Sequence, residues 1–259
     1  MNEKSLRAAL RKLRLGGLHF YQTIGSTSDV ALAWATDGAR DLSLVCAEEQ
    51  TQGRGRGDRR WITHLESALA FSLVLRPAEK ESASIPLFSA LGALAVSQVL
   101  ENLDLHPQVK WPNDVLLERR KVCGILAESV WMGERVDSVV LGIGINIRPE
   151  SVPPQEMLMY PATSLESELG RSVDRELVLR DILSALIEWR PRLGTDAFLR
   201  AWENWLAFRE ETVTVSAGGK LICRGQVLGL ERDGGLRLLD KNGKIISVQF
   251  GEVSLRPVV

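Results

Sequence analysis

Residues 110–147 contain extended segments and turns without a helical pattern, and this stretch constrains the fold more than any other. It opens with KWPNDV, in which Pro112 fixes a tight turn with Asn113 and Asp114 at its tip. RRKVCGILAESVW then reads as a hairpin strand, and RVDSVVLGIGINI as a long apolar strand. Because strands joined by short turns pair antiparallel, the chain is predicted to contain a mostly antiparallel sheet.

The spacing of apolar residues extends this pattern toward both ends of the chain. Leu87, Leu91 and Leu94, for example, share one face of a helix. Helices are expected at residues 3–13, 26–38, 85–103, 174–190 and 196–208. Further strands are expected at residues 18–24, 42–49 and 68–75. Helices combined with a mostly antiparallel sheet make an α+β domain.

The character of the sequence changes after Glu211. Short strand-like runs follow, and the turn signals Asp233–Gly235 and Asn242–Gly243 separate the last of them. With 259 residues, of which 45% are apolar, the chain is long enough for a large and a small domain. We predict an α+β domain over residues 1–210 and a small all-β, barrel-like domain over residues 211–259.

Positive charge is concentrated in one glycine-rich segment, QTQGRGRGDRRW at residues 50–61, called here the arginine segment. Its arginines oppose a single acid, Asp58, although the formal net charge of the whole chain is only −1. The alternating glycines let backbone amides and guanidinium groups reach the same anion. A solvated loop and an RNA-binding arginine/glycine segment are the alternatives. The segment is single and lies between two expected core strands, which favours a small phosphate-bearing ligand.

Two lysines flank the KWPND turn, and Lys121 opens an apolar strand. A plain hairpin turn is the alternative to a functional role for Lys110 and Lys121. His64 and His106 belong to no recognisable pattern and are expected at the surface. No Ser-His-Asp or Cys-His arrangement is evident, so the sequence does not support a hydrolase.

Cysteine usage and apolar runs indicate where such a protein resides. Cys46, Cys123 and Cys223 are widely spaced and form no C-x-x-C pair, which predicts reduced, mostly buried thiols. The N-terminal segment lacks the apolar core of a signal peptide, and we find no apolar run of membrane-spanning length. A cytoplasmic protein without membrane contact is therefore expected.

Six motifs follow one another along the chain: GSTSD (25–29), EEQTQGRGRGDRRW (48–61), KWPNDV (110–115), RRKVCGILAE (119–128), GIGINI (142–147) and GEVSLR (251–256). In this order, and over nearly the whole chain, they resemble the biotin–protein ligases, which attach biotin to a lysine of carboxylase carrier domains. The arginine segment followed by KWPND is the most specific pairing. Lipoate ligases are related in fold but lack it.

The resemblance implies an α+β catalytic domain of the class II synthetase/lipoate-ligase type and a C-terminal SH3-like β-barrel. It also implies ATP and biotin as substrates, Mg²⁺ as a cofactor, and a biotin carboxyl carrier protein as the partner. GSTSD begins at residue 25. This suggests the form of the family without an N-terminal DNA-binding domain, and no DNA partner is expected. A homodimer is left open.

The resemblance further implies which residues form the site. Lys121, Arg56 and Asp114 would be catalytic, with Asp114 also a candidate Mg²⁺ ligand. The residues implied for biotin are Ser26, Thr27, Gln50, Gly53, Arg54, Arg56, Lys121 and Gly124. Those implied for the nucleotide are Arg54, Arg56, Arg59, Trp61, Asn113, Lys121 and Asn146.

Two positions depart from the pattern of the family. Ser28 stands where an asparagine is common, and Asp58 replaces a glycine beside the phosphate-binding arginines. The contribution of Ser28 is therefore open, and Asp58 is expected to tether the arginine segment or change how it closes. A lipoate or octanoate ligase is the alternative within the fold. A nucleic-acid-binding module that uses the arginine segment is the alternative from another class.

Overall fold

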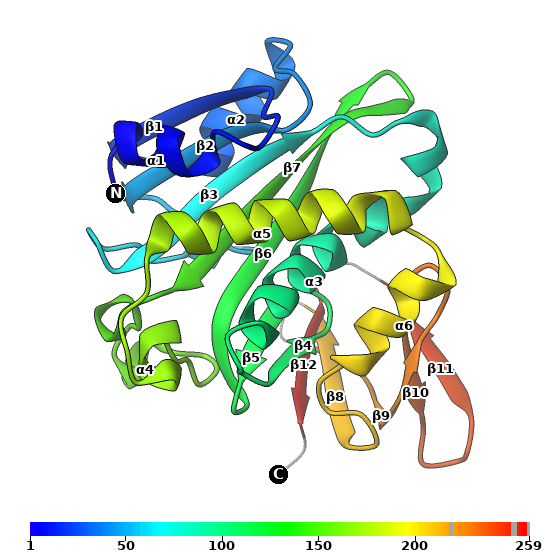
Figure 1. Cartoon of the computed structure of the whole chain (residues 1–259). Coiled ribbons are helices and arrows are strands. Elements are labelled where there is room, and N and C mark those ends of the chain that lie inside the picture. The colour runs from blue at the N-terminus through cyan, green and yellow to red at the C-terminus, as the bar shows by residue number, and fades with distance from the viewer. Residues whose placement is uncertain (58, 218–219, 250–252, 258–259) are drawn as a thin grey trace.

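The computed structural model describes residues 1–57, 59–217, 220–249 and 253–257, with the backbone alone for residues 253–255. Within these residues the chain forms a seven-stranded sheet flanked by helices, and a separate five-stranded sheet (Figure 1). Both sheets are mostly or wholly antiparallel, so the predicted mixture of helices with a mostly antiparallel sheet is confirmed.

The larger sheet has the strand order β1-β2-β3-β7-β6-β5-β4. Its strands are β1 (Gly17–Ile24), β2 (Ser43–Gln50), β3 (Ala68–Leu75), β4 (Pro107–Lys110), β5 (Asp114–Leu117), β6 (Arg120–Met132) and β7 (Arg135–Asn146). β1 and β2 pair parallel, and the other neighbours pair antiparallel. The register sets Gly124 of β6 opposite Gly144 of β7, which leaves a patch of the sheet without side chains.

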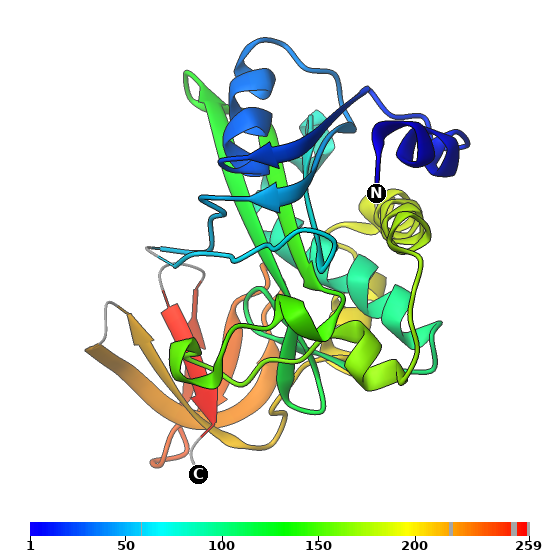
Figure 2. The ribbon, with the colours of Figure 1, turned by 90° about the vertical axis from the view of Figure 1, so that its left-hand side faces the viewer.

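Helices cover both faces of the larger sheet. They are α1 (Glu3–Leu10), α2 (Thr27–Thr36), α3 (Phe88–Glu101), α4 (Leu165–Leu169), α5 (Arg175–Trp189) and α6 (Asp196–Asn204). α2 lies on one face, and α3 and α5 lie on the other (Figure 2). Ala31 and Ala35 of α2 pack on Val45, Val74 and Val140 of the sheet, forming a small core of their own.

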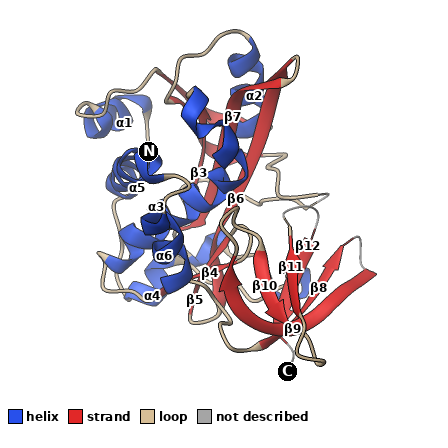
Figure 3. Ribbon diagram, turned by 90° about the vertical axis from the view of Figure 1, so that its right-hand side faces the viewer, coloured by secondary structure: helices blue, strands red, loops and turns tan. Residues whose placement is uncertain are grey.

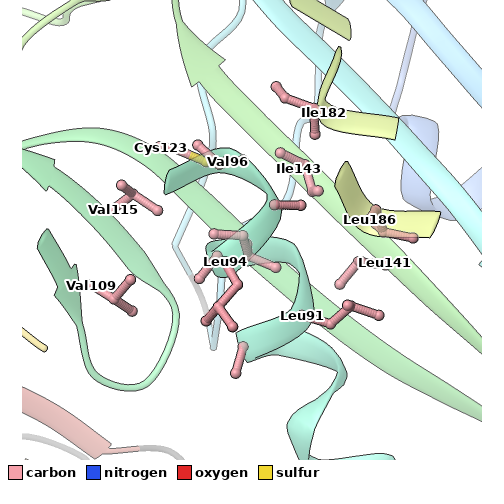
Figure 4. Close-up of a cluster of buried hydrophobic side chains, with 14 of the residues drawn as sticks. Leu91, Leu94, Val96, Val109, Val115, Cys123, Leu141, Ile143, Ile182 and Leu186 are labelled. Atoms are coloured by element: carbon pink, nitrogen blue, oxygen red, sulfur yellow. The ribbon is translucent and has the colours of Figure 1, made fainter. Parts of the chain in front are cut away.

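The main core is centred on α3, between the sheet and α5. Leu91 and Leu94 of α3, Leu141 and Ile143 of β7 and Leu186 of α5 all belong to this cluster (Figure 4). All five side chains are almost fully buried. The predicted helical spacing of leucines therefore marks the buried face of α3.

The segment Glu79–Glu101 joins α3 to a preceding 3₁₀ turn, η1 (Glu79–Leu87). By length and composition it could cross a membrane, although the sequence patterns above did not single it out. In the fold, 72% of its most apolar window is buried inside the protein. Its apolar side chains thus pack in the protein core, which is common for a central helix of a globular domain.

The smaller sheet has the order β11-β10-β9-β8-β12 and lies next to β4 and α6 (Figure 3). Its strands are β8 (Thr212–Ala217), β9 (Lys220–Leu230), β10 (Leu236–Leu239), β11 (Ile245–Val248) and β12 (Val253–Pro257). Gly234 and Gly243 have positive φ in the two predicted turns. The buried Trp111 ties the two sheets together, because its Nε1 donates to the carbonyl oxygen of Gly234 at 3.0 Å.

Two parts of the fold differ from the sequence-based expectation. The helix expected over residues 196–208 ends at Asn204, because Trp205 and Ala207 exchange backbone hydrogen bonds with Val109 of β4. Tertiary pairing therefore overrides helical periodicity there. β12 and α4 had no clear pattern in the sequence and were not expected as elements.

Candidate active site

The arginine segment connects β2 to β3 and forms a narrow hairpin. Trp61 N donates to Gly53 O at 2.9 Å, and Gly55 N donates to Arg59 O at 2.8 Å. A Cβ atom on Gly53 would lie 2.3 Å from the carbonyl oxygen of Trp61, so only glycine permits this close pairing. The stem of the segment is thus ordered by backbone hydrogen bonds. Asp58, for which a tethering role was predicted, lies outside the described residues.

One cleft lies between this hairpin, α2 and strands β5 to β7, and it encloses about 650 Å³ of space that is partly open to solvent. Ten of the residues implied for the site line it: Thr27, Gln50, Arg54, Arg56, Arg59, Trp61, Asn113, Asp114, Lys121 and Gly124. Ser26, Gly53 and Asn146 do not. The fold therefore brings together residues that are distant in the sequence.

One end of the cleft is polar and uncharged, at the start of α2. Gln50 Oε1 accepts hydrogen bonds from the backbone nitrogen of Thr27 at 2.8 Å and from Thr27 Oγ1 at 3.0 Å. Gln50 Nε2 donates to Thr63 Oγ1 at 3.2 Å. Ser26 Oγ is buried and has no hydrogen-bond partner within the described residues. Ser26 does not line the cleft itself, so the polar groups of Thr27 and Gln50 are what make this end suited to a ligand that carries polar atoms.

Ser28, the departure from the family pattern, faces the sheet beside this polar end. Its Oγ lies 3.1 Å from Ser72 Oγ. A Cβ atom on Gly142 would come within 2.8 Å of Ser28 Oγ. The missing side chain of Gly142 therefore makes room for Ser28.

The other end of the cleft is charged and centred on Asp114. Its two oxygens contact Lys121 Nζ at 2.6 Å and Lys110 Nζ at 3.2 Å. Burial alone would raise the pKa of Asp114, but the charges of Lys121 and Lys110 outweigh this effect and lower the pKa to about 2. Burial lowers the pKa of Lys110 to about 8, in spite of Asp114. Two ammonium groups around one carboxylate leave an excess of positive charge, which favours an anion.

An aromatic ring extends this charged end toward the smaller sheet. Lys110 Nζ lies 4.5 Å from the ring centroid of Tyr160, and the guanidinium carbon of Arg256 lies 5.3 Å from the same centroid. Tyr160 belongs to the irregular connection between β7 and α4. No motif marked Tyr160 in the sequence, whereas Arg256 lies in the terminal GEVSLR motif, of which residues 251–252 are outside the described part of the chain.

The floor of the cleft is the glycine patch on β6 and β7, and Trp61 lies on it. A Cβ atom on Gly144 would be 2.4 Å from the Trp61 ring, and one on Gly124 would be 3.0 Å from it. Lys121 Nζ is 5.5 Å from the centre of this ring. Trp61 Nε1 is buried and has no hydrogen-bond partner within the described residues. The missing side chain of Gly144 thus makes room for Trp61, and an indole N–H is left to donate to a ligand.

The two asparagines implied for nucleotide binding donate hydrogen bonds to backbone carbonyl oxygens in this structure. Asn113 Nδ2 donates to the carbonyl oxygen of Ile125 at 2.7 Å. Asn146 Nδ2 donates to the carbonyl oxygen of Thr163 at 3.0 Å, and its side chain is buried. Recognition of an adenine edge by Asn146 stays a prediction.

The cysteines and histidines lie outside this site, whose charged groups are lysines, arginines and one aspartate. Cys46 and Cys123 are buried and free, and Cys223 is free and partly buried, as predicted. His64 and His106 are exposed, also as predicted. Among the described residues, no cluster of three His, Cys, Asp or Glu side chains could hold a metal.

Comparison with known proteins gives consistent matches. The family model described as "Biotin/lipoate A/B protein ligase family" matches residues 20–146. The biotin–[acetyl-CoA-carboxylase] ligase of Paracoccus denitrificans is 34% identical over 85% of this chain and 92% of that protein. The bifunctional ligase/repressor BirA of Bacillus subtilis is 30% identical over 98% of this chain and 79% of that protein.

A solved structure extends the likeness to three dimensions. The biotin protein ligase from Aquifex aeolicus in complex with biotin and ATP superposes with a TM-score of 0.78 and 31% identity. The match covers 93% of this chain and 99% of that one. The fold is therefore shared over almost the whole molecule.

Proposed function

The chain belongs to the biotin/lipoate A/B protein ligase family, and we propose that it acts as a biotin–[acetyl-CoA-carboxylase] ligase. It joins biotin to ATP as biotinyl-5′-AMP and then transfers biotin to a lysine of a biotin carboxyl carrier protein. One observation carries this proposal: a single cleft combines an uncharged polar end, formed by Thr27 and Gln50, with a cation-rich end. Such a cleft fits a ureido ring at one end and a carboxylate beside a phosphate at the other.

The first step requires two anions to meet. A carboxylate oxygen of biotin forms a bond to the α-phosphorus of ATP, and the bond from that phosphorus to the bridging oxygen breaks, so that pyrophosphate leaves with the electron pair. Lys121 and Arg56 line the cleft where this occurs, and their charges offset the repulsion and stabilise the transition state. Lys121 can exchange its contact with Asp114 for the phosphate, because Lys110 still neutralises Asp114.

The second step transfers the activated acyl group. The neutral amine nitrogen of the acceptor lysine bonds to the acyl carbon, the bond from that carbon to the AMP oxygen breaks, AMP leaves with the electron pair, and the proton lost by the nitrogen passes to solvent. Asp114 is a carboxylate with a pKa of about 2, so it orients the incoming ammonium group but does not retain its proton near neutrality. We assign Asp114 an electrostatic role for this reason.

Mg²⁺ is best explained as part of the substrate. Both oxygens of Asp114 are held by ammonium groups, and the described residues offer no cluster of metal ligands. The residues therefore do not fit a resident Mg²⁺ site, and Mg²⁺ commonly arrives bound to nucleotide phosphates. We propose that it enters as MgATP.

Further parts of the proposal concern the whole molecule. The five-stranded sheet is assigned to a small SH3-like barrel domain over residues 211–259, with the catalytic domain over residues 1–210. Its antiparallel order and its hairpin turns support this assignment. The partner is a carrier domain in the cytoplasm, where ATP is available. A homodimer, and the absence of DNA binding, stay predictions.

Biotin-dependent exchange of labelled pyrophosphate into ATP tests the first step without any acceptor. We expect exchange with biotin, and mass spectrometry should then find biotin on one lysine of a carrier domain. Exchange with lipoate but not with biotin would move the assignment to a lipoate ligase. Salt-dependent retention of RNA, without exchange, would instead favour a nucleic-acid-binding module.

A further inference from the structure

Arg54 differs from a free phosphate-binding arginine because carboxylates from outside the arginine segment already hold it. Its Nε lies 3.0 Å from Asp29 Oδ1 of α2, and its Nη2 lies 2.5 Å from Glu128 Oε2 of β6. The side chains of Arg54, Asp29 and Glu128 are 34%, 57% and 27% exposed. Two acids on different elements thus share one guanidinium group at the rim of the cleft.

The position of this cluster matters as much as its charge. Asp29 lies in the first turn of α2, next to Thr27 at the polar end of the cleft. Glu128 lies on β6, the strand that also carries Lys121 and Gly124. Arg54 therefore connects the stem of the arginine segment to both walls of the cleft, one wall on α2 and the other on β6.

The charge balance indicates that Arg54 is committed to these contacts. Two carboxylates on one guanidinium more than neutralise it, whereas a phosphate ligand needs a guanidinium with free donors. Burial raises the pKa of Glu128 despite the opposing charge of Arg54. Glu128 is therefore partly desolvated, and losing Arg54 would remove the cation beside it at the rim.

We propose that Asp29 and Glu128 are positioning residues that anchor the arginine segment through Arg54 and so keep the activated intermediate in the cleft. The inference rests on the proposed ligase function. Arg54 lines the cleft together with Arg56 and Arg59, but its contacts with Asp29 and Glu128 make its part in adenylate binding indirect.

The test compares Asp29→Asn, Glu128→Gln and the double variant with the wild type. Release of preformed biotinyl-adenylate should be about twofold faster in each single variant and about fourfold faster in the double variant, as expected for two partly exposed ion pairs whose effects multiply. The rate of adenylate formation should stay within about twofold of wild type. Asp29→Glu, which keeps the charge, should restore slow release.

Two measurements separate anchoring from general destabilisation. Glu188→Gln removes an Arg–Glu pair of similar chemistry on α5, where Glu188 contacts Arg192 at 3.2 Å, and it should leave release unchanged. In the ligand-free protein, amide hydrogen exchange should increase in the double variant at Gly55 and Trp61, whose N–H groups hold the stem.

The outcomes distinguish this inference from the proposed function. Wild-type release and wild-type exchange in the double variant would overturn the anchor. A loss of adenylate formation in Arg54→Met as severe as in Arg56→Met would place Arg54 on the reacting groups and would also overturn it. If the wild type forms no biotinyl-adenylate, the proposed function fails, and the exchange measurement still decides whether the stem is anchored.

Discussion

Lys121 is the residue on which the proposed chemistry depends most. It is 25% exposed and contacts Asp114 at 2.6 Å on the cleft side, so its charge can be redirected to a ligand. Lys121→Ala should slow adenylate formation about a hundredfold, which corresponds to about 3 kcal/mol of barrier in a water-excluded site. Lys121→Arg should restore only part of the rate of adenylate formation, because the planar guanidinium group of arginine fills the space differently from a compact ammonium group.

The fold should tolerate this change, because Lys110 still neutralises Asp114. We therefore expect the melting temperature of Lys121→Ala to stay close to that of the wild type. Lys241→Ala, at an exposed turn position, is the matched control and should retain full activity. Near-normal pyrophosphate exchange in Lys121→Ala would make Lys121 a surface lysine and Lys110 the next candidate.

The buried Lys110 leads to a prediction about how the free energy of unfolding depends on pH. Its pKa in the fold is about 8, below the ordinary value of about 10.4 for lysine. Between these pH values the unfolded chain binds more protons than the folded chain, so this group's contribution to the free energy of unfolding increases as the pH rises. Lys110→Met removes that contribution. Urea unfolding should show the stability of the wild type increasing relative to Lys110→Met from pH 8 to pH 10.

Lys12→Met provides the control for this measurement, because Lys12 is exposed on the surface. Its stability relative to the wild type should not change over the same pH range. A difference between wild type and Lys110→Met that is independent of pH would show that burial does not lower the pKa of Lys110. Asp114 remains paired with Lys121 in this variant, so the cluster keeps one ion pair.

The arginine segment acts as an element, and its tip is expected to become ordered on the adenylate. Ordering the backbone of one residue costs roughly 1–2 kcal/mol of conformational entropy, which the binding of a multiply charged ligand can offset. Arg56→Ala should weaken this closure and release activated biotin, so that lysines of bystander proteins become labelled. Mass spectrometry of an added bystander protein measures this leak. Arg14→Ala, an exposed arginine near the N-terminus, should not label bystanders. Retention of the adenylate as tight as in the wild type would refute the lid role of Arg56.

The sequence predicted most elements of the fold, because apolar spacing fixes which face of each is buried. The leucines of α3 are a clear case. What it could not predict were features that arise only from contacts between distant segments. The end of α6 depends on pairing with Val109, and the position of Tyr160 depends on Lys110 and Arg256.

The same limit applies to the site. Ten of the residues that the motifs implied line one cleft. The motifs did not reveal that Arg54 is paired with Asp29 and Glu128, or that Trp61 covers Gly144, because both depend on tertiary contacts. The charge of a residue can be read from a sequence, but its partners are set by the fold.

At the scale of the whole molecule, Trp111 joins the two sheets. It is 1% exposed and donates to Gly234. Trp111→Ala should lower the free energy of unfolding by about 3–5 kcal/mol, since it opens a cavity between the sheets and leaves a carbonyl oxygen unpaired. Chemical denaturation measures this loss. Trp131→Ala is the matched control, because Trp131 is 62% exposed, and a loss of similar size there would contradict the role given to Trp111.

The indole of Trp61 has one further consequence. It lies on the glycine floor of the cleft, close to the ammonium group of Lys121, and its N–H has no partner in the described part of the chain. Any molecule that settles on this floor changes the polarity and the electric field around the ring. The emission spectrum of Trp61 should therefore shift when the cleft fills, and the protein carries its own optical probe of occupancy, readable by stopped-flow fluorescence without a label.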